Sequence, residues 1–307
     1  MPPAAEPHTE RHTERQSEPH EELLVFSDLP TFQHFLEQRH QRWPEQVMRT
    51  LRLIALHGIR EPISGRRIEA AGLELKGDNI RESLSDQGCL ARHRAILLVM
   101  ERLIASGRLP RAEALDLYSP ELLTPFASRL RQLVPGSRGS EYIPDPSDPR
   151  RLSLEHQDLC ALSHADASFD AVVCNELFEH LYDLPAALRE IARVLRPGGV
   201  LLSTSPLAYD RQQSIVKARH RPGSTPGSAE VELLTEPEFH GNPFNPQQKS
   251  LVYQIPGWDL LDQAHQAGLV DACFHWVASP SHGVVGQEIP AVIVFVAHAP
   301  ATPAPQG

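Results

Sequence analysis

The sequence predicts an α/β fold built on a parallel β-sheet, with a helical lobe before it. After Pro110, short apolar runs alternate with segments of helical period, which is the pattern of strand–helix–strand units. Residues 169–173 are apolar enough to form a strand that is buried on both faces, as the strands of parallel sheets are. Before Pro110, apolar residues between positions 29 and 59 recur at spacings of three, four and seven, which indicates helices.

Size and charge exclude several functional classes. The 307 residues suffice for one large domain with an extension. The formal net charge of −10 argues against sequence-independent binding to nucleic acids, because their phosphates would be repelled. No stretch approaches the ~20 consecutive apolar residues of a membrane-spanning helix. We therefore expect neither a nucleic-acid nor a membrane partner, and the sequence does not indicate an oligomeric state.

The N-terminal tail and the cysteines point to a cytoplasmic protein without a metal. Residues 1–22 lack the basic start and apolar core of a secretory signal, and their Pro, Glu and His content predicts disorder. The three histidines of the tail could chelate a metal weakly, but a solvated charged tail is the favoured interpretation. The four cysteines lie far apart without a Cys-x-x-Cys pair, so we expect reduced, mostly buried thiols and no zinc knuckle.

The helical lobe is predicted over residues 23–110. A helical pattern over residues 29–59 is interrupted at Pro44, residues 58–88 show no clean period, and residues 90–104 form a strong helix. Asn79, Arg81 and Arg92 in this lobe could dock it onto the sheet or bind an acidic group of a substrate, and docking is the favoured role.

The second domain is predicted over residues 111–299, followed by a disordered tail over residues 300–307. Its first strand is expected at 112–118, followed by a helix over 119–134. Ser119 would cap this helix, Pro120 would be its first-turn proline, and the negative charge of Glu121 would favour the helix N-terminus. The remaining elements are expected as strands at 139–142, 152–157, 169–173 and 200–204, helices at 184–195 and 257–268, and strands at 271–278 and 291–298. Residues 207–250 are too long for an ordinary connection and form a lid or a disordered insert.

The run from Gln157 to Pro206 resembles class I S-adenosylmethionine-dependent methyltransferases, in particular the small-molecule, type 11-like branch. The matching features are an acid at Asp158, the Asp-x-Ser-Phe-Asp stretch at 166–170, a buried strand, the Glu179–His180 pair, and a helix that ends in Arg-Val-Leu-Arg-Pro-Gly-Gly. The resemblance implies a three-layer, Rossmann-like domain with a seven-stranded sheet whose last strand is antiparallel. It also implies S-adenosylmethionine as the cofactor.

The candidate cofactor ligands follow the predicted strands. Ligands of such sheets bind outside the carboxyl ends of the strands, where Asp116, Glu141, Asp158 and Asn175 fall. Glu141 follows Asp116 by 25 positions (141 minus 116), close to the ~20-residue offset of a ribose-binding carboxylate. The resemblance implies that Asp158 accepts from the adenine amino group, that the Leu159 amide faces the ring, and that Asn175 lines the methionine portion. Each acid could instead be a helix cap or a solvated loop residue.

The first loop departs from the family pattern. Where the family usually has Gly-x-Gly-x-Gly, this chain has Tyr118, Ser119, Pro120, Glu121 and Leu122. Glycines permit close approach of the backbone to a cofactor, so Tyr118 and Pro120 are expected to crowd the methionine end. Ser119 could still cap the helix or bind a carboxylate. A similar glycine-poor loop occurs in a divergent branch of the superfamily that this chain resembles.

Methyl transfer needs in-line positioning of donor and acceptor, and a hydroxyl acceptor also benefits from a general base. His240 and His180 are the candidates, with a structural role favoured for His180 and base or substrate contact for His240, although a loop histidine is as often solvated. The expected acceptor is a small molecule such as a sugar or natural product. The alternative is a non-catalytic relative that keeps the fold for binding. A nicotinamide oxidoreductase is disfavoured because no Gly-x-Gly-x-x-Gly follows a first strand.

Overall fold

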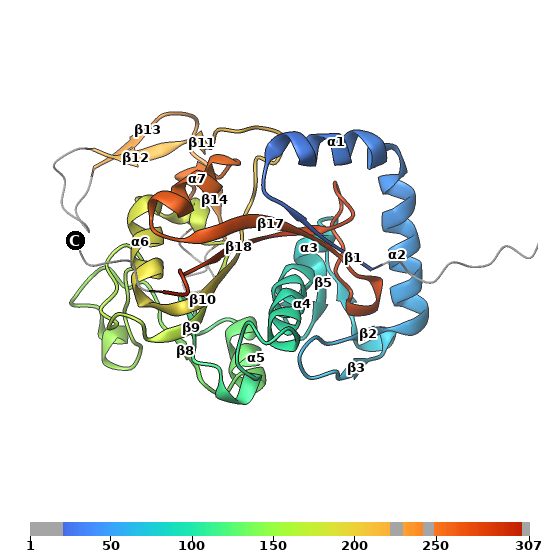
Figure 1. Ribbon diagram of the computed structural model, residues 1–307, viewed down its shortest axis with the longest axis horizontal. Helices are drawn as coiled ribbons and strands as arrows, with labels where there is room; N and C mark the ends of the chain where they lie inside the picture. The colour runs from blue at the N-terminus through green and yellow to red at the C-terminus, as the bar shows by residue number, and fades with distance from the viewer. Residues whose placement is uncertain (1–20, 222–229, 242–248, 303–307) are drawn as a thin grey trace, which may run out of the picture.

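The computed structural model describes residues 21–221, 230–241 and 249–302. A twisted central sheet lies between helices on both of its faces, and the two long N-terminal helices extend along one end of the molecule (Figure 1). The predicted α/β class is confirmed. No helix in these three ranges combines the length and the apolarity that crossing a membrane requires.

The central sheet has seven strands, and the four that carry the site are parallel. Across the sheet the order is β1 (Glu22–Phe26), β17 (Val270–Ala278), β18 (Val292–His298), β10 (Leu195–Thr204), β9 (Phe169–Asn175), β7 (Leu117–Ser119) and β8 (Ser137–Gly139). β8, β7, β9 and β10 are parallel neighbours, whereas β18 is antiparallel to both β10 and β17. The predicted antiparallel last strand is therefore confirmed.

Alternating side chains of the central strands divide the core into two layers. Val172 and Cys174 of β9 face one cluster, and Ala171 and Val173 face the other. The first layer is covered by α1 (Leu29–Arg39), α6 (Leu184–Val194) and α7 (Asp259–Gln266), and the second by α4 (Ala91–Ala105) and α5 (Pro125–Leu133). Because α4 packs directly on the sheet, the predicted N-terminal lobe is not wholly separate from it.

The seventh strand does not come from the segment that the sequence predicts. Of the expected strand over 152–157, one parallel bridge remains, between Glu141 and His156, and a short 3-10 helix (Pro149–Leu152) precedes it. The edge strand is instead β1, which pairs antiparallel with β17. Residues 1–20 of the predicted disordered tail lie outside the described residues, and β1 begins at Glu22, the last residue of that predicted tail.

The first strand and its helix begin later than predicted. Residues Ala112–Ala114 form a 3-10 turn, and β7 starts only at Leu117. The Ser119 hydroxyl donates to the carbonyl of Val173, so it holds the strand and does not cap a helix. The helix α5 starts at Pro125, where the Thr124 side chain accepts from the Ala127 amide at 3.0 Å.

The N-terminal segment wraps around one end of the sheet. α2 (Trp43–His57) follows α1 after a 3-10 turn, close to the break predicted at Pro44. The stretch without a clear period folds into short elements: β2 (Ile59–Arg60), β3 (Arg67–Ile68), β4 (Glu74–Leu75), α3 (Ile80–Ser83), β5 (Leu84–Asp86) and β6 (Cys89–Leu90). Of these, α3 brings Arg81 to the carboxyl edge of the parallel strands.

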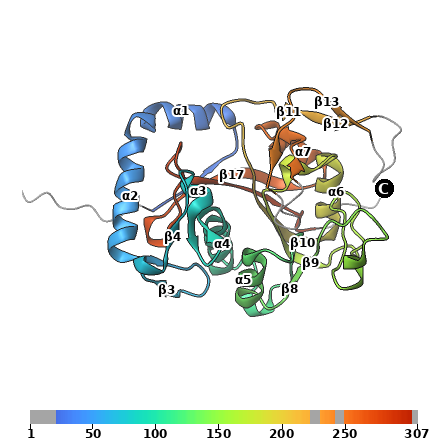
Figure 2. The same cartoon turned by 180° about the vertical axis from the view of Figure 1, so that it is seen from behind.

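The described parts of the insert form short antiparallel pairs near α7, at the end of the molecule opposite α2 (Figure 2). These are β11 (Ile215–Val216) with β16 (Gln254–Ile255), β12 (Ala218–His220) with β13 (Val231–Leu233), and β14 (Phe239–His240) with β15 (Ser250–Leu251). The prediction of a lid or a disordered insert also covers residues 222–229 and 242–248, which lie outside the described residues.

Candidate functional site

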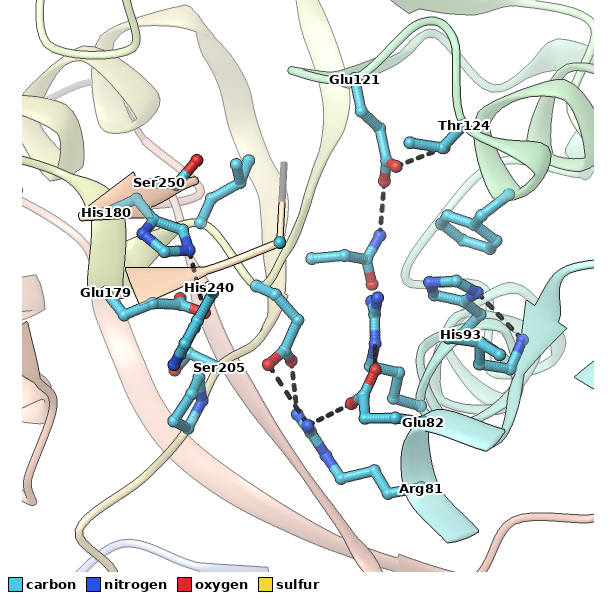
Figure 3. Close-up of a pocket in the computed structure, with 18 of the residues that line it drawn as sticks. Arg81, Glu82, His93, Glu121, Thr124, Glu179, His180, Ser205, His240 and Ser250 are labelled. Carbon is cyan, nitrogen blue, oxygen red and sulfur yellow. Dashed lines mark hydrogen bonds and ion pairs between the residues drawn. The ribbon is translucent and has the colours of Figure 1, made fainter. Parts of the chain in front are cut away.

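A cavity of about 1150 Å³ lies at the carboxyl ends of the parallel strands. Its wall combines the loop after β7, the segments after β8, β9 and β10, the lobe around α3, and the β14–β15 pair of the insert. Figure 3 shows two groups of side chains in the cavity: His180, His240 and Glu179 on one side, and Glu121, Thr124, Arg81 and Glu82 on the other. This is the edge of the sheet at which the strand-end rule predicts ligand binding.

Glu141 lines this cavity and also anchors the glycine-free loop. Its Oε1 accepts hydrogen bonds from the amides of Leu122 and Leu123, each at 2.9 Å. Oε2 makes no hydrogen bond to a described residue, so it is available to a ligand. These two hydrogen bonds hold the backbone of the loop in place, although the loop contains no glycine.

Asp158 and Leu159 also line the cavity. The Asp158 carboxylate accepts from the Cys160 amide through Oδ1 and from the Tyr182 hydroxyl through Oδ2, both at 2.9 Å. The Tyr182 ring stacks on His220 of β12, with ring centres 4.5 Å apart. A ligand that reaches Asp158 must share it with Tyr182, and this contact connects the strand end to the insert.

Asn175 ends β9 with one half of its amide unsatisfied. Its Nδ2 donates to Glu121 at 2.8 Å, while its buried Oδ1 has no hydrogen-bond partner among the described residues. Burial raises the pKa of Glu121, which also accepts from the Thr124 hydroxyl at 2.5 Å. A buried amide oxygen without a donor indicates a place for a ligand N–H, such as an ammonium group.

Three predicted cofactor residues do not line the cavity. Asp116 lies before β7, at the amino end of the strand, and pairs with Arg196 at 2.7 Å. The buried Tyr118 places its hydroxyl 2.7 Å from the Ser140 hydroxyl, and Ser119 is held by Val173. Asp116 was misplaced because the strand begins five residues later than expected. Tyr118 does not crowd the cavity because its ring points into the core.

The sequence did not single out Glu176, although it directly follows β9. Its φ of 49° lies in the left-handed region, an uncommon backbone conformation for a residue other than glycine. The Glu176 carboxylate pairs with Arg81 of α3 through both guanidinium nitrogens. Burial alone would raise the pKa of Glu176, but the charges of Arg81 and Arg92 lower it. The docking role favoured for Arg81 is thereby confirmed.

The other end of the cavity holds Glu179, His180 and His240. Glu179 is fully buried, and neither of its carboxylate oxygens has a hydrogen-bond partner among the residues that the structure describes. Its Oε1 lies 3.7 Å from Nε2 of His180 and 3.7 Å from Nδ1 of His240. The two imidazole rings are nearly perpendicular, with centres 5.3 Å apart. Both predicted catalytic histidines therefore lie together beside a carboxylate, and the sequence had not recognised that carboxylate as part of a site.

Hydrogen bonds on the far side of each ring fix its orientation. Nδ1 of His180 lies 2.8 Å from the Leu251 carbonyl oxygen and must donate to it. Nε2 of His240 lies 3.0 Å from Oε1 of Glu238. The carboxylates of Glu179 and Glu238 raise the pKa of His240 to about 9, against the opposing effect of burial. His240 would therefore be a poor general base at neutral pH while it keeps its proton.

Comparison with known proteins identifies the middle of the chain. Residues 137–203, from β8 to β10, match a family model described as a methyltransferase domain. A probable S-adenosylmethionine-dependent methyltransferase of Mycolicibacterium smegmatis is 45% identical over 56 residues, which are 18% of this chain and 22% of the relative. Demethylmenaquinone methyltransferase of Deinococcus radiodurans is 36% identical over 96 residues, 27% of this chain and 40% of the relative. The predicted resemblance is confirmed for this segment.

The matching segments cover only part of this chain and of its relatives. The chain covers less than half the length of these two relatives. A solved S-adenosylmethionine-dependent methyltransferase from Mesorhizobium loti aligns with 68% of this chain and 97% of its own, at 14% identity and a TM-score of 0.40. The fold assignment here depends on the strand order of the chain itself.

Proposed function

We propose that this chain, whose residues 137–203 match a methyltransferase-domain model, transfers a methyl group from S-adenosylmethionine to a small molecule. One observation carries the proposal. Glu141, Asp158 and Asn175 follow separate segments at the carboxyl edge of the sheet, yet all three line one cavity. In this fold that edge is the ligand-binding edge.

In the proposed complex the donor occupies the end of the cavity beside the first loop. Oε2 of Glu141 accepts from the ribose hydroxyls, Asp158 and Leu159 lie beside the adenine, and the unpaired Oδ1 of Asn175 accepts from the ammonium of the methionine portion. Tyr182 shares Asp158 with the adenine. Asp116, Tyr118 and Ser119 support the strand and do not touch the donor.

The acceptor occupies the remaining space, toward Glu179, His180 and His240. The cavity volume of about 1150 Å³ exceeds the upper end of the usual range for a single small ligand, ~1000 Å³, so it accommodates a donor and an acceptor together. Leu177, Leu207, Ile289 and Ile293 add apolar surface to the wall. This lining favours a natural product with an apolar part over a sugar, in agreement with relatives named for demethylmenaquinone and ubiquinone biosynthesis.

The reaction needs no group beyond the donor and the acceptor. An acceptor hydroxyl loses its proton to solvent, and its oxygen forms a bond to the methyl carbon while the carbon–sulfur bond breaks. The electron pair of that bond stays on sulfur, so the positively charged sulfonium becomes the neutral thioether S-adenosylhomocysteine. Holding both reactants in line supplies much of the rate enhancement.

The proposal is tested by calorimetric titration of the full chain with S-adenosylmethionine and S-adenosylhomocysteine, with NADH as the control ligand. We expect micromolar binding of the first two and none of NADH. Asp158→Asn should weaken binding at least fivefold, whereas Asp116→Asn, outside the cavity, should bind as the wild type does. Absence of binding by both sulfur compounds would contradict the proposal and favour a non-catalytic relative of the family.

A further inference from the structure

We propose that Glu179, His180 and His240 form a binding site for a divalent first-row transition-metal ion such as Zn²⁺ or Mn²⁺. In the described part of the chain, this is the only group of three His, Cys, Asp or Glu residues whose candidate ligand atoms all lie within 4.8 Å of one another. The proposal departs from the expectation of no metal, which considered cysteine pairs alone.

The first argument is a buried carboxylate without a hydrogen bond. Burial of a charged group without a hydrogen bond is unfavourable, yet Glu179 is fully buried, and among the described residues neither of its oxygens accepts a hydrogen bond. The two histidine nitrogens that face Oε1 stop at 3.7 Å, beyond hydrogen-bond distance. The buried carboxylate therefore has two ion-pair partners but no hydrogen bond to a described residue.

The second argument is that the gap suits a metal ion. Ligand atoms ~2.1 Å from a common ion in tetrahedral geometry lie ~3.4 Å apart. The two separations from Oε1 of Glu179, each 3.7 Å, differ from this by a few tenths of an ångström, and the three candidate ligand atoms all lie within 4.8 Å of one another. Rotation of the side chains would bring them to a common ion.

The third argument is the hydrogen bond that each histidine makes through the ring nitrogen facing away from Glu179. A metal-binding histidine usually donates its other ring N–H to a carbonyl or a carboxylate, which fixes the ring and the tautomer. His180 does so to the Leu251 carbonyl, which leaves Nε2 to face Glu179. His240 does so to Glu238, which is itself paired with Lys217, so that Nδ1 faces Glu179. Both rings therefore direct the nitrogen without an outer partner toward the same carboxylate.

The ligand types select the class of ion. Two imidazoles and one carboxylate suit Zn²⁺, Mn²⁺ or Fe²⁺, whereas Mg²⁺ and Ca²⁺ favour oxygen ligands. Three protein ligands leave at least one position open, as in catalytic metal sites, and all three line the cavity. The ion would also join the insert to the sheet, because His240 lies on β14 while Glu179 and His180 follow β9.

The role of the ion in catalysis rests on the proposed function, whereas the site itself does not. An acceptor hydroxyl at the open position would bind the ion through oxygen, and its pKa would fall. Its proton would then leave to solvent before the oxygen attacks the methyl carbon. The class of acceptor that follows is a hydroxylated compound, and the two histidines act as ligands in place of a general base.

The test is titration of chelator-stripped, full-length protein with Co²⁺, in the absence of any cofactor. We expect visible absorption bands that saturate at one equivalent and are abolished by Zn²⁺. Glu179→Gln and His240→Asn should each weaken binding more than 100-fold. Glu238→Gln, which removes the negative charge beside Nε2 of His240 together with the ion pair to Lys217, should weaken it ~10-fold to ~100-fold.

Two controls separate this site from other histidines. His57→Asn changes an exposed histidine at the end of α2, and replacement of His8, His12 and His20 by asparagine removes those of the tail. Both proteins should keep the one-equivalent bands. Absence of the bands in the wild type, or equal affinity in folded Glu179→Gln, would overturn the proposal. Because no S-adenosylmethionine is present, failure of the donor site would leave this result unaffected.

Discussion

Replacement of Glu141 by glutamine separates the two tasks that the structure gives this side chain. Oε1 holds the Leu122 and Leu123 amides, and the side chain also lines the cavity, where we propose that Oε2 accepts from the ribose. A glutamine keeps a carbonyl oxygen for the two amides but presents NH₂ in place of Oε2. Loss of a charge-assisted hydrogen bond to ribose costs about 2 kcal/mol, equivalent to a roughly 30-fold increase in the Kd of S-adenosylhomocysteine.

Alanine at the same position tests the anchor of the loop. It removes both acceptors, so the two amides lose their partner, and the free energy of unfolding should fall by about 2–4 kcal/mol. The free energy of unfolding of Glu141→Gln should lie within about 1 kcal/mol of the wild-type value. The assay pairs calorimetric titration with S-adenosylhomocysteine and urea denaturation of both variants. A folded Glu141→Gln that binds within twofold of the wild type would refute the ribose assignment, and an alanine variant of unchanged stability would refute the anchor.

Three further predictions concern stability. The buried guanidinium of Arg94 donates to four backbone carbonyl oxygens, so Arg94→Met should lower the free energy of unfolding by about 4 kcal/mol, and a loss below about 1 kcal/mol in urea denaturation would contradict this. Burial, with the charges of His298 and Arg108 adding to it, lowers the pKa of His275 to about 4, so stability should fall as the pH drops from about 6.5 to about 4, where only the unfolded chain takes up the proton. His275→Gln should flatten that part of the stability profile, and an unchanged slope would count against the assignment. Thr124→Ala removes the N-cap of α5 and should cost about 1 kcal/mol by thermal unfolding, whereas an unchanged melting temperature would speak against the cap.

Long, regular apolar patterns allowed the centre of the fold to be predicted. The helix expected at 184–195 is found at Leu184–Val194. The strand expected at 169–173 is found at Phe169–Asn175, two residues longer at its end. Here the local pattern and the burial in the final fold agree, so the sequence alone suffices.

The start of the first helix was predicted wrongly because the same capping pattern occurs twice within seven residues. Ser119–Pro120 and Thr124–Pro125 both read as a cap followed by a first-turn proline. A tertiary contact decides between them, since the Ser119 hydroxyl is already donated to Val173 on the neighbouring strand. The edge strand β1 was missed for a related reason, because its partner β17 lies about 250 residues away in the sequence.

The candidate site was predicted in part for the same physical reasons. The strand-end rule predicted that Glu141, Asp158 and Asn175 lie at one edge of the sheet, and all three line the cavity. Glu141 follows β8 and Asn175 ends β9, whereas the strand expected before Asp158 is reduced to a single bridge. It could not bring His240 to His180, which precedes it by 60 positions (240 minus 180). Their approach depends on the pairing of β14 with β15 inside the insert, and the Leu251 carbonyl of that pair also orients His180.

The central claim is that the cavity at the carboxyl edge of the sheet binds S-adenosylmethionine. The most direct measurement is a crystal structure of the full chain with S-adenosylhomocysteine. The account predicts the ribose within hydrogen-bond distance of Glu141, the adenine beside Asp158 and Leu159, and the amino group near Oδ1 of Asn175. S-adenosylhomocysteine bound outside this cavity, or an empty cavity at saturating concentration, would contradict it.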